Sequence, residues 1–450
     1  MPPFQIRLLL ALLFASAIAD GLARGADRKT ISLEQAYDLA LASDQSIRIA
    51  YFETRKANLL TWSALTKLGP QLTGDSGYSR SERTTRSTTS TTGAASSLDR
   101  SVNTDAGNGT ASLTFKQPLI DLTVFPAYRL GKLSAEVAKL QQQFTVRETL
   151  FGVASAYFEV LKQERLVAVN REALRLAGEQ LDLAQKRADV GEVTRSDVLR
   201  AQVVVETARR VLVESENVLE LDKNTLGNIL NLSPNTPFQV AEPPDYPSAL
   251  PLFEELLSRA YSHREDLRVK ELAIGQDTER RNEIYGEYGP RVVAQWDGQI
   301  AHASGSSASS ERDWQATVSV QVPFLTGGQR EIDLRSAGHQ IEQTKLERDR
   351  TAKAVEADTK QAWLTVRTLQ QTLKALHVQV VAAEQGYHDL ENQYRAGTST
   401  SVDVLSALND LNTARKDLAI QTYDFQVALR NLEQVSGVFQ EARVQASKIR

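Results

Sequence analysis

The sequence predicts an α+β protein made mostly of long α-helices of the coiled-coil type, with four β-strands per chain and an internal tandem repeat. Two similar segments, GEVTRSDVL from Gly191 and GTSTSVDVL from Gly397, are offset by 206 residues along the chain. Long heptad patterns of apolar residues flank both segments, and two pairs of strand-like segments precede them. A recurrence of this kind indicates duplication of one structural unit.

The composition is that of a folded protein, with 450 residues, 41% of them hydrophobic and 24% charged. Its net charge is -4, from 52 basic and 56 acidic residues spread along the chain. No basic patch therefore indicates a nucleic acid as a partner. There is no cysteine. Disulfides, thiolate metal sites and a lipid anchor on cysteine are therefore excluded.

The first residues have the pattern of a secretory signal peptide, which we place at residues 1–19. Arg7 precedes an apolar run from Leu8 to Ile18, and small residues stand at Ala17 and Ala19. A buried N-terminal helix is the alternative. No later run of about 18 apolar residues exists, so an exported chain that entered a membrane would have to do so as a closed β-barrel.

The heptad pattern runs along both sides of each repeated segment. Before the second segment the apolar positions are Leu369, Leu373, Leu376, Val380, Ala383, Tyr387, Leu390 and Tyr394. After it they are Val404, Ala407, Leu411, Ala414, Leu418, Phe425, Ala428 and Leu432, and subtracting 206 gives Val198, Ala201, Val205, Ala208, Leu212, Leu219 and Leu226. Large and small residues alternate, which favours a wall of closely packed helices over two ordinary amphipathic hairpins.

The helix before the first segment is predicted to run from about Leu130 to Asp189. At 1.5 Å per residue, some 60 residues span roughly 90 Å. Only Gly131, Gly152 and Gly178 interrupt the pattern, and no proline does. A single rod of this length is therefore expected.

Each repeated segment is predicted to be a tight reversal between two antiparallel helices. A glycine suits the left-handed residue that ends a helix, a threonine suits the N-cap of the next helix, and an aspartate three residues later can complete a capping box. These residues are Gly191, Thr194 and Asp197 in the first tip (191–197), and Gly397, Thr400 and Asp403 in the second tip (397–403).

Prolines bound the strand-like sequence in each copy. The predicted hairpins span 70–118 and 290–323, with Pro70 and Pro290 opening them and Pro118 and Pro323 closing them. Apolar and polar residues alternate along the strands, as they do when one face meets lipid and the other meets water, although a soluble β-sandwich strand shows the same alternation. Residues 79–110 and 301–313 are polar and are predicted to be exposed, mobile loops. The repeats are placed at 20–240 and 241–450.

Four strands cannot close a barrel, and an open sheet edge in lipid would leave backbone groups unpaired. Oligomerisation is therefore expected. Two chains would supply eight strands and three would supply twelve. The sequence leaves this choice open.

Taken together, the two copies of helix, Gly-Pro, strand pair, proline, long helix, Gly-x-x-Thr-x-x-Asp-Val-Leu tip and returning helix resemble the TolC-like outer membrane efflux protein family. The resemblance covers essentially the whole mature chain. It implies a homotrimer with a 12-stranded outer-membrane β-barrel, continued into the periplasm by a coiled-coil α-barrel. Such a protein is an outer-membrane channel of a Gram-negative bacterium. It is the exit duct of a tripartite efflux or type I secretion system.

The same resemblance implies partners and site residues. The partners are a periplasmic adaptor (membrane fusion) protein, an inner-membrane pump of the RND or ABC class and outer-membrane lipid. The tips would form the closed periplasmic aperture, where Asp197 and Tyr394 match tethering positions and Asp403 matches an aspartate ring. Ser399 and Ser406 replace an Arg and an Asp of the family's best-known member. For Asp403, helix capping alone is the alternative.

The sequence supplies no catalytic or cofactor site. The five histidines, His263, His302, His339, His377 and His388, have no ligand spacing, and neither a phosphate-binding Gly-Lys-Ser/Thr loop nor a Gly-x-Ser-x-Gly elbow occurs. No cofactor, metal or enzymatic activity is expected. The leading alternative function is a periplasmic coiled-coil structural or adaptor protein, or a filament subunit, with a secreted hydrolase a distant third. The transported substrate is not encoded in any motif.

Overall fold

The computed structural model describes residues 29–89, 98–233, 236–244, 250–305 and 309–446. The predicted signal peptide at 1–19 lies outside these residues. The chain divides into two compact units, each of which draws on both halves of the sequence. Unit 1 consists of the described residues of Met1–Arg48, Gln143–Arg264 and Val355–Arg450, and unit 2 consists of those of Ile49–Gln142 and Glu265–Ala354.

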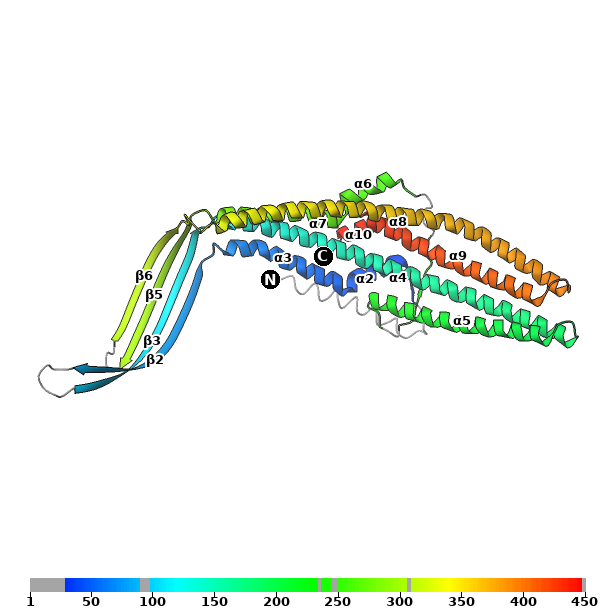
Figure 1. Ribbon diagram of the computed structural model, residues 1–450, viewed down its shortest axis with the longest axis horizontal. Helices are drawn as coiled ribbons and strands as arrows, with labels where there is room; N and C mark the ends of the chain where they lie inside the picture. The colour runs from blue at the N-terminus through cyan, green and yellow to red at the C-terminus, as the bar shows by residue number, and fades with distance from the viewer. Residues whose placement is uncertain (1–28, 90–97, 234–235, 245–249, 306–308, 447–450) are drawn as a thin grey trace, which may run out of the picture. The chain divides into compact units, whose positions relative to one another are not determined.

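Long helices dominate both units (Figure 1). The helices are α2 (Leu33–Ser43), α3 (Gln45–Thr66), α4 (Val124–Asp189), α5 (Arg195–Ile229), α6 (Phe253–His263), α7 (Glu265–Gly286), α8 (Gln329–Arg395), α9 (Ser401–Val435) and α10 (Glu441–Ala446). The strands are β1 (Lys29–Ile31), β2 (Gln71–Thr89), β3 (Leu98–Ile120), β4 (Phe238–Val240), β5 (Arg291–Gly305) and β6 (Ser309–Gln321).

The predicted rod is confirmed as the continuous helix α4 of 66 residues, and α8 has 67. The helix begins at Val124, six residues earlier than predicted. Pro126 is tolerated in the first turn of the helix, because the N–H that proline lacks would have no helical partner there. Gly131, Gly152 and Gly178 do not break it. Helices α5 and α9 have 35 residues each. Over the described residues, no helix combines the length and apolarity needed to cross a membrane.

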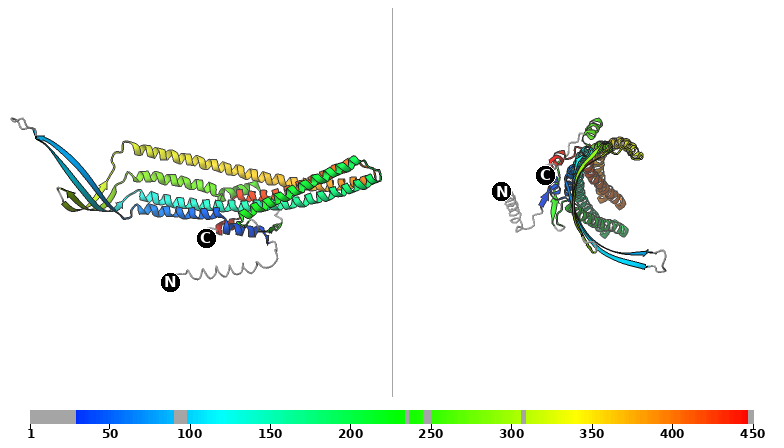
Figure 2. Two further views of the ribbon diagram at one scale, coloured as in Figure 1. Left: turned by 90° about the horizontal axis from the view of Figure 1, so that it is seen from below. Right: turned by 90° about the vertical axis from the view of Figure 1, so that its left-hand side faces the viewer.

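In unit 2, four antiparallel strands form one curved sheet in the order β2-β3-β5-β6 (Figures 1 and 2). The register aligns apolar residues with apolar ones across all four strands, and polar with polar in the adjacent rows. One row is Leu72, Phe115, Trp296 and Ala316, and the adjacent row is Gln71, Lys116, Gln295 and Thr317. The predicted strands are confirmed, and the sheet has one apolar and one polar face.

The prediction of loops at 79–110 and 301–313 is wrong for most of their length. Strand β2 continues to Thr89, β3 begins at Leu98, and only three residues separate β5 from β6. The loops were predicted from the absence of apolar residues, but ladder hydrogen bonds need none, and threonine favours extended backbone. Arg80 and Asp105 also form an ion pair across this polar part, with their side-chain atoms 2.5 Å apart.

One of the four bounding prolines, Pro118, lies inside its strand instead of at the end of it. Pro70 and Pro290 directly precede β2 and β5, and Pro323 follows β6, as predicted. Strand β3, however, runs two residues past Pro118. The pairing with β5 shifts register between Pro118 and Ile120, because a proline has no N–H to give to the ladder and is accommodated at a bulge.

Unit 1 is held at one end by a large apolar core around Tyr157 and Phe158, both fully buried. The Tyr157 hydroxyl lies 2.9 Å from the carbonyl oxygen of Ile31 and 2.5 Å from that of Ala241. It therefore fixes the short parallel pair β1-β4 onto α4. Burial raises the pKa of Tyr157 to about 12, so the phenol stays protonated and keeps its donor at neutral pH.

Candidate functional site

The two tips lie where α4 turns into α5 and α8 turns into α9, at the ends of the antiparallel helix pairs of unit 1 (Figure 1). Gly191 and Gly397 adopt φ angles of 80° and 79°. This is the left-handed conformation predicted for them, which any residue with a Cβ adopts at a cost of roughly 1 kcal/mol. Backbone bonds from Glu192 N to Arg187 O and from Thr398 N to Gln393 O close the two helix ends.

Both predicted capping boxes are present, and they are nearly identical. The carboxylate of Asp197 accepts from the backbone N–H (3.0 Å) and the hydroxyl (2.6 Å) of Thr194. The carboxylate of Asp403 accepts from the same two groups of Thr400, at 3.1 and 2.6 Å. Bonds to the threonine side chain and backbone lower the pKa of both aspartates below the ordinary value, so both are charged at neutral pH.

The predicted apolar seam packs the two helix pairs together above the tips. A buried cluster takes Leu176 from α4, Val205 from α5, Tyr387 from α8 and Val404 from α9. Every apolar seam residue predicted in α8 and α9 is buried or half-buried. The seam therefore makes the four helices one packed layer that carries both tips.

Arg187 joins the two tips, and sequence reasoning missed it. Its guanidinium donates to the carbonyl oxygen of Tyr394 at 2.5 Å and stacks on the ring of that tyrosine, 4.5 Å from the centroid. It also pairs with Glu192 at 2.9 Å, within its own tip. The Arg187 side chain is only 14% exposed, so its contacts with Tyr394 are largely shielded from water, whereas the side chain of Glu192 is 58% exposed.

A second polar link crosses the seam one heptad earlier. The side-chain amide of Gln180 donates to the hydroxyl of Tyr387 at 2.8 Å, in a buried setting. Gln180 and Arg187 are seven residues apart, as are Tyr387 and Tyr394. A polar residue of α4 and a tyrosine of α8 thus recur together after seven residues, and this recurrence is the signal in the sequence that indicates both links.

The structure does not connect Asp197 with Tyr394, the two residues expected to tether neighbouring helices. Tyr394 is 3% exposed, and among the described residues its hydroxyl has no hydrogen-bond partner. The Asp197 carboxylate accepts its hydrogen bonds from the N–H and the hydroxyl of Thr194. In a single chain, Tyr394 is held through its carbonyl group and its ring, both by Arg187, and its buried hydroxyl has no hydrogen-bond partner among the described residues.

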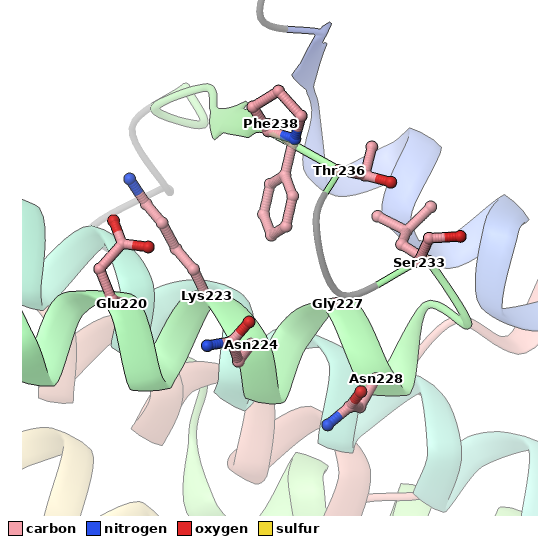
Figure 3. A pocket seen from close by; sticks show the side chains of 10 residues that line it. Glu220, Lys223, Asn224, Gly227, Asn228, Ser233, Thr236 and Phe238 are labelled. Carbon is pink, nitrogen blue, oxygen red and sulfur yellow. The ribbon is translucent and has the colours of Figure 1, made fainter.

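A separate hollow of about 410 Å³ lies beside the C-terminal end of α5 (Figure 3). Asn224 and Asn228 of α5 and the ring of Phe238 line it, and Lys223 on its rim pairs with Glu164 at 3.1 Å. Within the residues the structure describes, no cluster of three or more histidine, aspartate or glutamate side chains is placed to hold a metal ion.

Comparison with known proteins matches nearly the whole chain to one family. The model of the family described as outer membrane efflux protein matches residues 36–232 and 256–438. The chain is 23% identical to the proteases secretion protein PrtF of Dickeya chrysanthemi, over 93% of this chain and 90% of that one. It is 24% identical to the outer membrane protein TolC of Vibrio cholerae, over 74% and 78% of the two chains.

Solved structures show the same fold. The outer membrane protein VceC of Vibrio cholerae superposes with a TM-score of 0.70 at 19% identity, over 90% of this chain and 96% of that chain. At this identity the likeness establishes the arrangement of helices and strands.

Proposed function

Because the chain belongs to the outer membrane efflux protein family, we propose that three copies of it form the exit duct of a tripartite efflux or type I secretion system. Members of the family are channel proteins of the Gram-negative outer membrane, and this chain is such a channel. Its task is passage rather than catalysis, so a periplasmic adaptor and an inner-membrane pump of the RND or ABC class supply the energy and select the cargo.

The four-stranded sheet of unit 2 is the observation that carries this proposal. Among the described residues, β2 and β6 each pair on one side only. In hydrocarbon each unpaired backbone group costs several kcal/mol, so the outer edge of β6 must meet the β2 edge of another copy. Three copies give twelve strands, enough to leave an open lumen.

The two faces of the sheet support the same arrangement. The apolar face, with Trp296 and Trp314 among its exposed residues, suits lipid. The polar face carries a network in which Thr114 donates to Asp297 at 2.9 Å and Gln295 donates to the same carboxylate. Such a face suits a water-filled lumen.

Two helices of unit 1 keep an apolar flank exposed in a single chain, over the residues that the structure describes. Both α5 and α8 expose apolar side chains along their length: Leu199, Val203, Val213 and Leu221 on α5, and Leu364, Val378 and Val381 on α8. Exposed apolar residues in such numbers mark an interaction surface. Helices of neighbouring copies would cover them and close the periplasmic tunnel.

Two further assignments follow from the sequence. We place the repeats at 20–240 and 241–450, which is supported by the equal lengths of α5 and α9 and by the two separate segments that match the family model. We place the periplasmic aperture at the tips, 191–197 and 397–403. Directly before the first tip, Val190 is 71% exposed and offers an apolar contact to the adaptor.

Asp403 provides a direct test, because Asp197 is a matched control with the same capping box. If three Asp403 carboxylates lie about 6 Å apart across the axis, with an effective dielectric near 20, each pair repels by roughly 3 kcal/mol. Such a ring attracts cations. We expect Asp403→Asn to lower the cation selectivity of single channels in planar bilayers, and Asp197→Asn to leave it unchanged.

The same recordings test both levels of the proposal. A correctly exported wild-type protein that never conducts would rule out the duct and favour a periplasmic adaptor or filament subunit. If the channels conduct and their selectivity is the same in Asp403→Asn and wild type, the proposed duct is still supported. Asp403 would then act only as a helix cap.

A further inference from the structure

The apolar face of the sheet contains a hollow of about 680 Å³ that spans β3, β5 and β6. Leu113, Trp296, Ile300 and Trp314 line it. The indole of Trp296 lies along its own strand over Gly298, where an added Cβ would come within 2.7 Å of the ring. Gly298 therefore lets the indole lie flat against the sheet and leaves the space beside it open.

Arg312 also lines the hollow, at the level where the apolar face ends. It faces Ile300 across the ladder, and the next row of the same face pairs His302 with Ser310. From Gln321 to Arg312 the strand rises about 30 Å at ~3.4 Å per residue. At a tilt near 40° this is about 23 Å along the membrane normal, close to the ~25 Å apolar band of such proteins.

The guanidinium of Arg312 is not neutralised by the sheet. In the part of the chain that the structure describes, no carboxylate forms an ion pair with it. Arg80, on the same face, is paired with Asp105. An arginine beside an apolar hollow at the height of lipid headgroups is suited to a phosphate, which its planar fork binds through two parallel hydrogen bonds.

We propose that this hollow binds a phosphorylated glycolipid of the outer leaflet. An acyl chain lies between Trp296 and Trp314, and a lipid phosphate contacts Arg312, with His302 and Ser310 at the rim. This inference rests on the proposed function, because it places the β2-β3 and β5-β6 turns on the outer side of the membrane. Arg312 lies toward those turns, so the outer leaflet, whose main lipid is a glycolipid of the lipid A type, supplies the ligand.

The test is native mass spectrometry of the assembled channel, titrated with diphosphorylated lipid A. We expect Arg312→Gln to weaken binding at least about tenfold, because it removes the charged fork that would donate two parallel hydrogen bonds to the phosphate. Arg83→Gln is the matched control. It removes the same charge from the opposite face of the sheet, since odd-numbered residues of β2 face away from Leu72 and Arg80. Removal of the lipid phosphates should weaken wild-type binding to a similar degree.

Three outcomes would overturn the proposal: equal lipid A binding by Arg312→Gln and wild type, equal loss in Arg83→Gln, or phosphatidylglycerol binding as tightly as lipid A. The last would show an unselective anionic lipid contact. The same spectra report the number of chains in each particle. Failure of the proposed function, seen as an absence of oligomers, is thus distinguished from failure of the lipid site.

Discussion

Replacing Arg187 with alanine is expected to release the two tips from each other and to raise the conductance of the channel. The substitution removes the hydrogen bond to the Tyr394 carbonyl, the stacking on its ring and the ion pair with Glu192. A shielded bond from a charged donor contributes about 1.5 to 3 kcal/mol and a cation–π contact about 0.5 to 2 kcal/mol. Because the Tyr394 hydroxyl has no partner among the described residues, no polar contact of that side chain replaces them.

Arg395→Ala is the control for this experiment. Arg395 is next to Tyr394 in the sequence, but its side chain is 60% exposed and pairs with Glu391 on its own helix. We expect it to leave conductance unchanged. The chain has no cysteine, so spin labels on Val190→Cys and Thr398→Cys report the separation of the tips without background. Equal conductance and equal label distances in the two arginine variants would show that Arg187 does not hold the tips.

A positive charge on the apolar face of the sheet is expected to prevent assembly in the membrane. Ala316 stands in the row of Leu72, Phe115 and Trp296, near the middle of the apolar band. An arginine at the bilayer midplane of a membrane sheet costs about 2 to 4 kcal/mol, and three copies would carry it in one channel. We therefore expect Ala316→Arg to abolish the outer-membrane oligomer.

The neighbouring Thr317→Arg is the matched control, because successive residues of a strand point to opposite faces. Its arginine would face the lumen, so we expect a normal yield of oligomer and a changed ion selectivity. The measurement is the amount of oligomer recovered from detergent-extracted outer membranes. If both variants assemble equally, the apolar face does not contact lipid.

Local rules predicted much of the fold and of the tips. The capping boxes of Thr194 and Thr400 and the left-handed glycines depend on residues within one turn of each other, so their spacing in the sequence was sufficient. The packed seam of the helices could also be predicted, because a heptad period of apolar residues is typical of helices that bury one stripe. The apolar parts of the strands followed from their alternation.

What the sequence did not reveal depends on contacts between distant segments. The polar ends of β2 and β3 are strands because they pair with each other, and nothing in their own pattern distinguishes them from loops. Arg187 resembles any charged residue near a helix end until α8 places the ring and carbonyl of Tyr394 beside it. The bulge at Pro118 likewise follows from pairing with β5.

The number of copies in the channel is tested by the mass of the particle extracted from native outer membranes in mild detergent. We expect three chains per particle, because over the described residues a single chain supplies one four-stranded sheet whose β2 and β6 edges are unpaired, and helices with uncovered apolar flanks. Dissociation to single chains on heating should accompany loss of conductance. A stable single chain recovered from the periplasm or the membrane, with no larger particle, would contradict this expectation.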